Sequence, residues 1–171
     1  IPGDELARLL RPCLPHLDLL IANDHEIGGI AGIPTVRNGE TDLAACRDAA
    51  LALLEKGVRQ VVAVHFPGGA IMASRDGRVV EMPSVKVPKS ANAGANGAGD
   101  AFAAGFLYGW HEGWSAEDGL RLAHATAAAS LRHITTYGGV ESWSNCMAIA
   151  NGWGWHETLR PIPMEHINET S

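Results

Sequence analysis

Two short apolar runs on either side of a helical pattern constrain the fold of this chain most strongly. Residues 17–21 and 61–64 are almost continuously apolar, which is typical of strands buried on both faces of a parallel sheet. Between these runs, apolar residues from Leu43 to Leu54 recur at helical spacing, and Thr41 is the expected N-cap. The order of strand, helix and strand predicts an α/β fold.

Flanking signals add to this arrangement. A short helix is expected around Leu9 before the first strand, and Asp76-Gly77 reads as the turn of a hairpin formed by residues 70–74 and 78–82. Ser115 opens a later helix with an acid three residues on. We therefore expect a three-layer α/β/α protein, in which helices cover both faces of a mostly parallel sheet.

Composition and charge limit the partners. The chain has 171 residues, 46% of them hydrophobic, and a net charge of −6 without a run of like charges, which argues against a nucleic-acid or anionic-membrane surface. Its apolar stretches are too short to span a bilayer, and no signal-peptide pattern is present. Three widely spaced cysteines without a CxxC motif favour reduced thiols. A cytoplasmic protein with a small-molecule partner is expected.

The glycine-rich stretch 94–109 points to an anion site. Gly97-Ala98-Gly99 can present backbone N–H groups at the start of a helix, where the helix dipole also favours negative charge. The stretch is neither a P-loop, because Asp100-Ala101 stands where Lys and Ser or Thr are needed, nor a dinucleotide fingerprint, because it ends in Phe102. A cradle for phosphate with an adjacent carboxylate remains.

Asp100 is the candidate general base. An aspartate with an unperturbed pKa of about 3.9 is ionised at neutral pH and can take a proton from an attacking hydroxyl. Phosphoryl transfer tolerates such a weak base, because its transition state is loose. The alternative is that Asp100 only complements the helix dipole, as many aspartates do.

The residues from Asn96 to Phe106 resemble the GAGD signature of the ribokinase (PfkB) family of ATP-dependent carbohydrate and nucleoside kinases. The resemblance implies that Asp100 is the catalytic base and that the backbone of Gly97, Ala98 and Gly99 forms the anion hole. It also implies a ribokinase-like fold and ATP as the phosphate donor.

Asn23-Asp24-His25-Glu26 is similar to the NxxE element of the same family. This similarity implies that Asn23 and Glu26 support Mg²⁺, partly through water, as the preference of Mg²⁺ for oxygen ligands and retained waters also suggests. The element follows a predicted strand, where α/β folds bind ligands. A helix-capping Asn with a surface Glu is the alternative.

Two further segments resemble the walls of the family's nucleotide pocket: the loop 65–69 and the segment 123–139. His124 falls where members often have an asparagine near the adenine, although a histidine packed on a helix is an equal alternative. The resemblance implies a nucleotide-binding set of Asn23, His65, Gly68, Gly69, Asn96, His124, Gly138 and Gly139. No histidine pair has zinc-ligand spacing.

The resemblance covers about residues 5–150, and we expect residues 1–150 to form a partial kinase domain and 151–171 an unassigned tail. Its N-terminal part, with the lid and most sugar contacts, is expected to lie upstream. Gly94-Ala95-Asn96 replaces the Asp-Thr-Thr common in members, so a monovalent-cation site is uncertain, and Val64-His65-Phe66 replaces the usual Thr-x-Gly. Asn168-Glu169-Thr170 matches a glycosylation acceptor by chance.

The expected function is ATP- and Mg²⁺-dependent phosphorylation of a hydroxyl group on a sugar or sugar-like alcohol. A nucleoside kinase of the same family and a non-catalytic, sugar-binding relic of the fold are the alternatives. Neither nucleic acid nor a membrane is an expected partner, and the oligomeric state is open, with a homodimer as one alternative.

Overall fold

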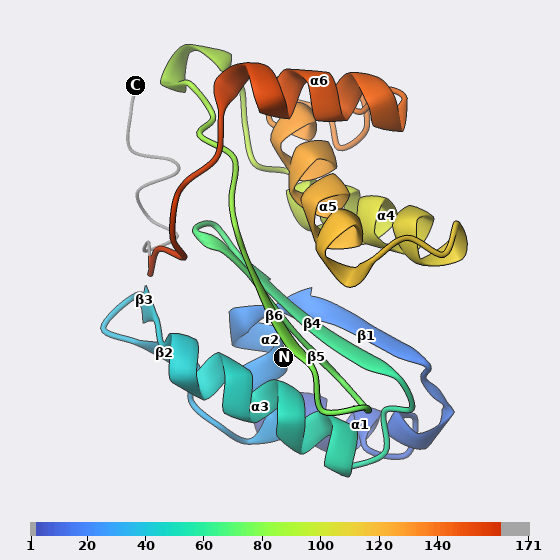
Figure 1. Cartoon of the computed structure of the whole chain (residues 1–171). Helices are drawn as coiled ribbons and strands as arrows, with labels where there is room; N and C mark the ends of the chain where they lie inside the picture. Colours follow the sequence, from blue (N-terminus) through green and yellow to red (C-terminus); the bar gives the residue numbers. More distant parts are fainter. Residues whose placement is uncertain (1–2, 162–171) are drawn as a thin grey trace. The chain divides into compact units, whose positions relative to one another are not determined.

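The computed structural model of this protein describes residues 3–161 and divides into two compact units (Figure 1). The first unit runs up to Glu81 and includes Pro161, and the second runs from Met82 to Arg160. Each unit is described by itself.

The first unit is built on a four-stranded sheet of order β1-β4-β5-β6. The strands are β1 (Leu19–Asn23), β4 (Val61–Phe66), β5 (Gly69–Ser74) and β6 (Val79–Pro83), the last of which crosses the boundary between the units. β1 and β4 pair in parallel, and β4 and β5 pair antiparallel. The α/β class is confirmed, and the sheet is mixed rather than mostly parallel.

β4 is longer than expected, and only a two-residue turn separates it from β5, so the two strands can pair only antiparallel. The apolar run of β4 ends at Val64, but the strand continues through His65 and Phe66, and β5 begins at Gly69. The segment expected to be a loop over residues 65–69 is therefore mostly strand, with a turn only at residues 67 and 68. The hairpin around Asp76-Gly77 is confirmed.

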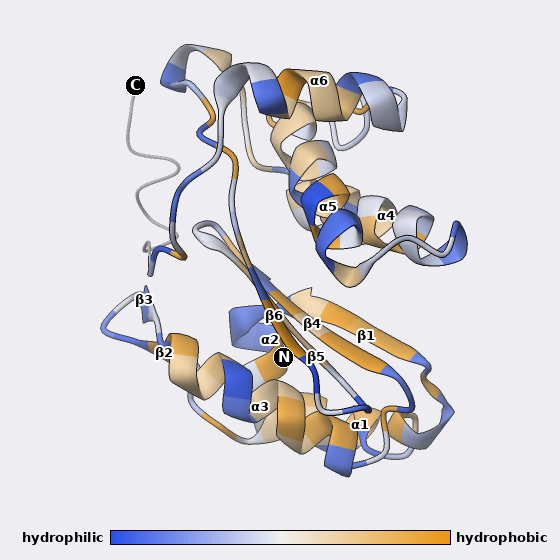
Figure 2. Cartoon of the chain, viewed as in Figure 1, coloured by the Kyte–Doolittle hydropathy of each residue, from blue (hydrophilic) through white to orange (hydrophobic). Residues whose placement is uncertain are grey.

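Three helices accompany this sheet: α1 (Gly3–Leu10), α2 (Asp24–Ala31) and α3 (Leu43–Glu55), with a 3-10 turn, η1 (Leu14–His16), after α1. α2 contacts both β1 and α3, and α3 packs on β4 and β5. Figure 2 shows that β1, β4 and much of α3 are hydrophobic, as elements of a shared core should be.

The N-terminus of α3 corrects one expectation. Asp42, not Thr41, is the N-cap, and its carboxylate accepts a hydrogen bond of 3.0 Å from the Ala45 N–H. Thr41 instead ends β3 (Glu40–Thr41), which pairs with β2 (Val36–Arg37) as a short antiparallel hairpin. The Thr41 side chain is buried, and its hydroxyl donates a hydrogen bond to the Asp24 carboxylate.

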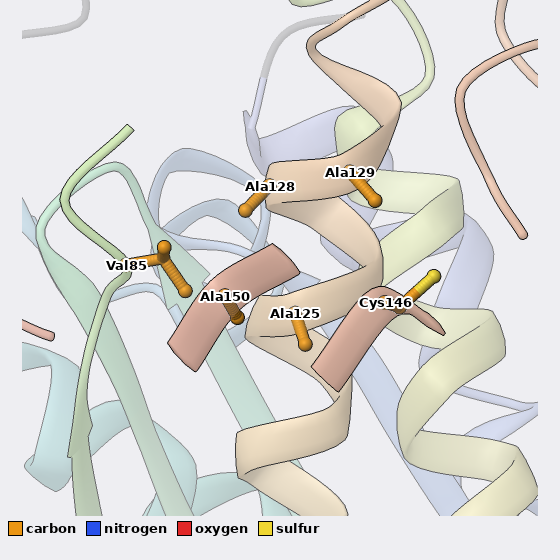
Figure 3. Close-up of a cluster of buried hydrophobic side chains, with 6 residues drawn as sticks. All are labelled: Val85, Ala125, Ala128, Ala129, Cys146 and Ala150. Atoms are coloured by element: carbon orange, nitrogen blue, oxygen red, sulfur yellow. The ribbon is translucent and has the colours of Figure 1, made fainter. Parts of the chain in front are cut away.

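The second unit is helical, with α4 (Ala98–His111), α5 (Ala116–Ser130) and α6 (Trp143–Trp153), preceded by the 3-10 turn η2 (Lys89–Ala91). Ser115 caps α5 as expected, by accepting a hydrogen bond from the Asp118 N–H. Figure 3 shows how small side chains of α5 face α6 and Val85, which lets these elements approach closely; the cluster is Val85, Ala125, Ala128, Ala129, Cys146 and Ala150.

The expected end of the kinase domain at residue 150 lies inside α6, and Trp155 beyond it forms a bridge with Val85. The rest of the expected tail from residue 162, with the glycosylation-like triplet, lies outside the described residues. No helix in residues 3–161 is long and apolar enough to cross a bilayer. Cys46 and Cys146 are buried, as expected for packing cysteines, whereas Cys13 is exposed.

Candidate active site

The glycine-rich stretch turns sharply into α4 at Gly97. This residue is the N-cap of α4 in the left-handed conformation, with φ of 79°. A Cβ atom built on it would lie 2.7 Å from the Thr136 Cβ and 2.8 Å from the Thr136 carbonyl oxygen. A glycine is therefore required here both by the backbone conformation and by the close approach of the segment 131–139.

The first turn of α4 presents free backbone donors. The Ala98 N–H donates to the Ala95 carbonyl oxygen at 3.2 Å, and the Ala101 N–H donates to the Gly97 carbonyl oxygen at 2.9 Å. The N–H groups of Gly97, Gly99 and Asp100 have no acceptor within residues 3–161. Such unpaired amides at a helix N-terminus can bind an anion. Of the three expected donors, Ala98 is the one already engaged.

Asp100 is the third residue of α4 and its side chain is exposed. An acid at this position commonly accepts a hydrogen bond from the N-cap backbone. Here the structure, over the residues it describes, gives the Asp100 carboxylate neither a hydrogen bond nor an ion pair. The carboxylate is therefore available to a ligand beside the free amides.

The expected nucleotide wall lies against the same loop. The Ala93 N–H donates to the Leu131 carbonyl oxygen at 2.7 Å, which joins the stretch before Asn96 to the end of α5. Arg132 donates to the Gly139 carbonyl oxygen at 2.8 Å and to the Glu141 carboxylate at 2.5 Å. Its guanidinium is the main cause that lowers the pKa of Glu141.

The two glycines of this wall have close neighbours. A Cβ on Gly138 would meet the His133 ring at 2.7 Å, and one on Gly139 would lie 3.0 Å from the Ser130 carbonyl oxygen. Asn96 is exposed in the loop before Gly97. The structure thus brings Asn96, Gly97, Gly138 and Gly139 into one unit with Asp100.

His124 lies inside the helix packing of this unit. It is 5% exposed, and its ring meets Phe102 of α4 edge to face, with 5.0 Å between the ring centroids. This placement corresponds to the packed-histidine alternative, and a contact with adenine stays a prediction.

The NxxE element forms a capping box in the first unit. Asn23 is both the last residue of β1 and the N-cap of α2; its Oδ1 accepts the Glu26 N–H at 2.8 Å, while Glu26 Oε2 accepts the Asn23 N–H at 3.0 Å. The capping role considered for these two residues is therefore present. It does not exclude a ligand role, because Glu26 is exposed and its Oε1 has no partner among the described residues.

The remaining expected residues of this unit lie nearby in the sheet. Asn23 is the register partner of His65 across the parallel pair β1 and β4. Gly68 lies in the turn after β4, and Gly69 begins the antiparallel strand β5. Asn23 and His65 are therefore at the carboxyl ends of neighbouring parallel strands, where α/β proteins bind ligands.

The donor set suits Mg²⁺ but does not form a complete cage. Within residues 3–161 no group of three or more histidine, cysteine, aspartate or glutamate side chains could hold a metal ion. Mg²⁺ commonly takes one or two carboxylates and completes its shell with phosphate oxygens and water. The free oxygen of Glu26 and the nearby Asn23 side chain match that partial role.

Asp24 is a residue of this region that the sequence analysis did not single out. Its carboxylate is 2% exposed and accepts hydrogen bonds from the Thr41 hydroxyl at 2.7 Å and from the His25 N–H at 3.0 Å. Buried aspartates are rare unless their oxygens are satisfied. An aspartate directly after an N-cap looks like a surface acid, so only the fold reveals its burial.

The first unit has parallel strands whose carboxyl ends carry polar side chains, and the second has a helix with unpaired first-turn amides. Each feature is typical of α/β proteins that bind phosphate groups. The match to a family model agrees with this class and is more specific. The chain belongs to the pfkB family of carbohydrate kinases, whose model matches residues 2–143.

Curated relatives and a solved structure are similar to parts of this chain. Adenosine kinase 1 of Arabidopsis thaliana is 25% identical over 95 residues, which is 56% of this chain and 28% of the relative. The 2-dehydro-3-deoxygluconokinase of Escherichia coli is 32% identical over 77 residues, 45% of this chain and 25% of the relative. Arabidopsis thaliana ribokinase, solved with ribose and ATP, superposes with a TM-score of 0.70 at 22% identity, covering 82% of this chain and 43% of that one.

The fold and the family membership rest on different comparisons. The ribokinase-like fold is confirmed by the superposition, and family membership by the match over most of the chain. The chain spans about a quarter of the length of these two curated relatives.

Proposed function

We propose that this protein transfers the terminal phosphate of ATP to a hydroxyl group of a sugar or sugar-like alcohol. Asp100 is the general base, and the amides at the start of α4 stabilise the transferred charge. The observation that carries the proposal is an exposed carboxylate beside three amides, none of which has a partner among residues 3–161, in a chain of the pfkB family.

The position of Asp100 suits a base. Its exposed carboxylate lies in the first turn of a helix, where it can accept the proton of an incoming hydroxyl. A base held in place contributes typically about 10²–10⁴-fold to a rate. Because the transition state of phosphoryl transfer is loose, the hydroxyl does not need early deprotonation.

The backbone amides stabilise negative charge on the phosphate. The N–H groups of Gly97, Gly99 and Asp100 are fixed by the helix and need no reorganisation to meet negative charge on a phosphate. We assign the anion hole to these three groups, so the expected contribution of Ala98 rests on its place in the turn and not on a free donor. Phosphate charge beside Asp100 is tolerated because these donors offset it.

Asn23 and Glu26 are proposed to support Mg²⁺ through oxygen ligands and water. When bound, Mg²⁺ would neutralise part of the phosphate charge. The residues proposed for nucleotide binding remain Asn23, His65, Gly68, Gly69, Asn96, His124, Gly138 and Gly139. A monovalent-cation site, a homodimer and a cytoplasmic location stay predictions.

The acceptor class has one specific alternative. A relative that this chain resembles carries the name adenosine kinase, and another is named for a sugar acid, so a nucleoside acceptor is the second candidate. A panel of sugars, sugar acids and nucleosides tested with the intact protein separates the two by kcat/KM.

Asp100→Asn in the intact protein tests the base. We expect kcat to fall by about 10²–10⁴-fold. Thermal stability should change little, because the exposed carboxylate has no partner among the described residues. Asp118→Asn is the matched control, since Asp118 is the third residue of α5 and accepts a hydrogen bond from Ser115 at 2.7 Å. It should leave phosphate transfer unchanged. Near-normal turnover of Asp100→Asn would remove the proposed base.

The non-catalytic alternative is tested by calorimetry. Binding of the sugar without binding of ATP and Mg²⁺ would favour a relic of the kinase fold. Binding of both, together with turnover, would exclude it.

A further inference from the structure

The first turn of α2 is tied to a hairpin that follows it in the chain. Asp24 is the first residue of this helix, and its Oδ2 accepts a hydrogen bond of 2.7 Å from the hydroxyl of Thr41 at the end of β3. Its backbone carbonyl oxygen accepts a second one, of 2.6 Å, from the hydroxyl of Thr35, which precedes β2. Both threonines connect the same turn of α2 to the same hairpin.

These contacts are buried. Asp24 and Thr35 are each 2% exposed and Thr41 is 5% exposed. A Cβ on Gly28 would collide with the Thr35 hydroxyl and would lie 2.8 Å from the Ile33 carbonyl oxygen, so the close approach of the hairpin requires a glycine there. Hydrogen bonds shielded from water in this way are costly to break, because the polar groups left behind stay buried.

The charge of Asp24 has no cation beside it. Within residues 3–161, the carboxylate forms no ion pair, and its oxygens are satisfied by the Thr41 hydroxyl and the His25 N–H at the positive end of α2. Burial, and then the charges of Asp24 and Asp42, raise the pKa of the Cys46 thiol to about 12. The neighbouring thiol is therefore neutral and adds no like charge.

Asp24 stands between the two members of the capping box. Asn23 precedes it and Glu26 follows two residues later in the same turn, and these two bind each other through both backbone N–H groups. A turn that is anchored at Asp24 holds its exposed face in one orientation, and that face carries the free oxygen of Glu26.

We propose that Asp24 is a positioning residue that, through its buried bond to Thr41, fixes the Asn23–Glu26 capping box and hence the Glu26 carboxylate. The part of this inference that concerns the metal rests on the Mg²⁺ role proposed above for Glu26. The part that concerns the capping box rests on the contacts alone.

Thr41→Val is the main test, because valine matches the shape of threonine and removes only the hydroxyl. Thr41→Ser keeps the hydroxyl and is the matched control, and Asp42→Asn alters a neighbouring carboxylate that caps α3 instead of α2. Asp24→Asn is a second test variant, which changes the acceptor of the same Thr41–Asp24 hydrogen bond. Each is made in the intact protein and compared with the wild type.

Two measurements are made on each variant. Hydrogen exchange reports the Glu26 N–H, which is bonded to Asn23, and the Ala45 N–H, which is bonded to Asp42, serves as an internal reference. Metal binding is measured with Mn²⁺ in the presence of a non-hydrolysable ATP analogue, from the paramagnetic resonance signal of the free ion. This second readout does not depend on turnover.

We expect Thr41→Val to accelerate exchange at Glu26 but not at Ala45, and to weaken Mn²⁺ binding by about tenfold, as removal of groups that orient metal ligands typically does. Thr41→Ser and Asp42→Asn should resemble the wild type. Unchanged exchange at Glu26 in Thr41→Val would overturn the proposal, as would equal weakening of Mn²⁺ binding by Thr41→Ser.

The failure of the proposed function would look different. If Asp100→Asn kept its turnover while Thr41→Val still accelerated exchange at Glu26 and weakened Mn²⁺ binding, the assignment of the base would be wrong and the positioning role of Asp24 would hold.

Discussion

The N-termini of α2 and α4 carry an acid at the same helical position, and the structure treats the two acids differently. Glu26 is the third residue of α2 and accepts a hydrogen bond from the N–H of its N-cap, Asn23. Asp100 is the third residue of α4 and forms no such bond with Gly97. The difference begins with the cap, because Asn23 is extended and has a side-chain acceptor, whereas Gly97 is left-handed and has no side chain.

This comparison shows that the N-terminus of α4 lacks a stabilising cap that α2 has. A capping side chain is typically worth about 0.5–2 kcal/mol, and α4 has none. In return, its first amides and its first carboxylate stay open to a ligand. Local rules of stability are commonly broken at functional sites, and α4 breaks them at the family's GAGD signature.

The largest expected effect comes from adding a side chain at Gly97, the N-cap of α4. Gly97→Ala places a Cβ 2.7 Å from the Thr136 Cβ at a φ of 79°, so both the loop and the segment 131–139 must shift. We expect kcat/KM for phosphate transfer to fall by about 10²-fold or more, as when a donor to transition-state charge is misplaced. Steady-state kinetics with ATP and the best acceptor measure this.

Gly113→Ala is the control for this change. Gly113 has φ of 72° and nothing within 4 Å of an added Cβ. The variant is therefore destabilised only by the left-handed conformation of alanine, which costs about 1–2 kcal/mol, and not by a steric collision. Its phosphate transfer should be normal. If Gly113→Ala lost as much activity as Gly97→Ala, general destabilisation and not the anion hole would explain the loss.

The elements that carry the site could be predicted from the sequence to different extents. The apolar run 61–64, the Asp76-Gly77 turn and the Ser115 cap are local signals, and the structure confirms each of them. The run 17–21 also indicated a strand, but β1 lies at Leu19–Asn23 and its residues are only partly buried. The boundaries of β4 and β5 could not be read in the same way, because His65 and Phe66 continue the strand through pairing with Ala70 and Gly69, and His65 also pairs with Asn23. Pairing is a tertiary effect that local composition does not carry.

The candidate site shows the same division. The sequence around Asp100 indicates the start of a helix. It cannot show that the Ala98 N–H is hydrogen-bonded to the Ala95 carbonyl oxygen while the N–H groups of Gly97 and Gly99 have no acceptor among the described residues. Thr41 was an acceptable cap by residue type, yet Asp42 takes that role and Thr41 bonds to Asp24. Two adjacent residues competed for the cap, and only the path of the hairpin decides between them.

A second prediction concerns how α4 is held in place. A Cβ on Gly105 would collide with the Thr126 hydroxyl and would lie 2.8 Å from the Leu122 carbonyl oxygen, and Thr126 donates to the Ala101 carbonyl oxygen at 2.7 Å. Gly105→Ala is therefore expected to lower the free energy of unfolding by about 1–3 kcal/mol. Denaturant unfolding measures this.

Gly119→Ala on the facing helix sharpens that measurement. An added Cβ there would only touch the Phe106 ring at 3.8 Å, so the higher helix propensity of alanine should raise the free energy of unfolding by up to about 1 kcal/mol. Opposite signs for the two variants would show that close packing, and not glycine content, holds α4. A loss of stability in both would contradict the packing described for these helices.

The smallest expected effect separates the two roles of Glu26. Glu26→Gln keeps an acceptor for the Asn23 N–H, since glutamine also closes a capping box, but it removes the charge that would face Mg²⁺. The Mg²⁺ concentration needed for half-maximal phosphate transfer should rise by about tenfold, while KM for the acceptor stays near the wild-type value. Titration of the rate with Mg²⁺ at saturating ATP measures it.

Glu26→Ala then removes the hydrogen bond as well. It should show the same Mg²⁺ requirement as Glu26→Gln and a further loss of stability of about 1 kcal/mol, the usual net value of one hydrogen bond. If both variants kept the wild-type Mg²⁺ requirement and only Glu26→Ala lost stability, Glu26 would be a cap like Ser115. The contrast between the closed terminus of α2 and the open terminus of α4 would then leave the phosphate chemistry to α4, because a carboxylate whose only function is to close its own helix has no part in binding the ion.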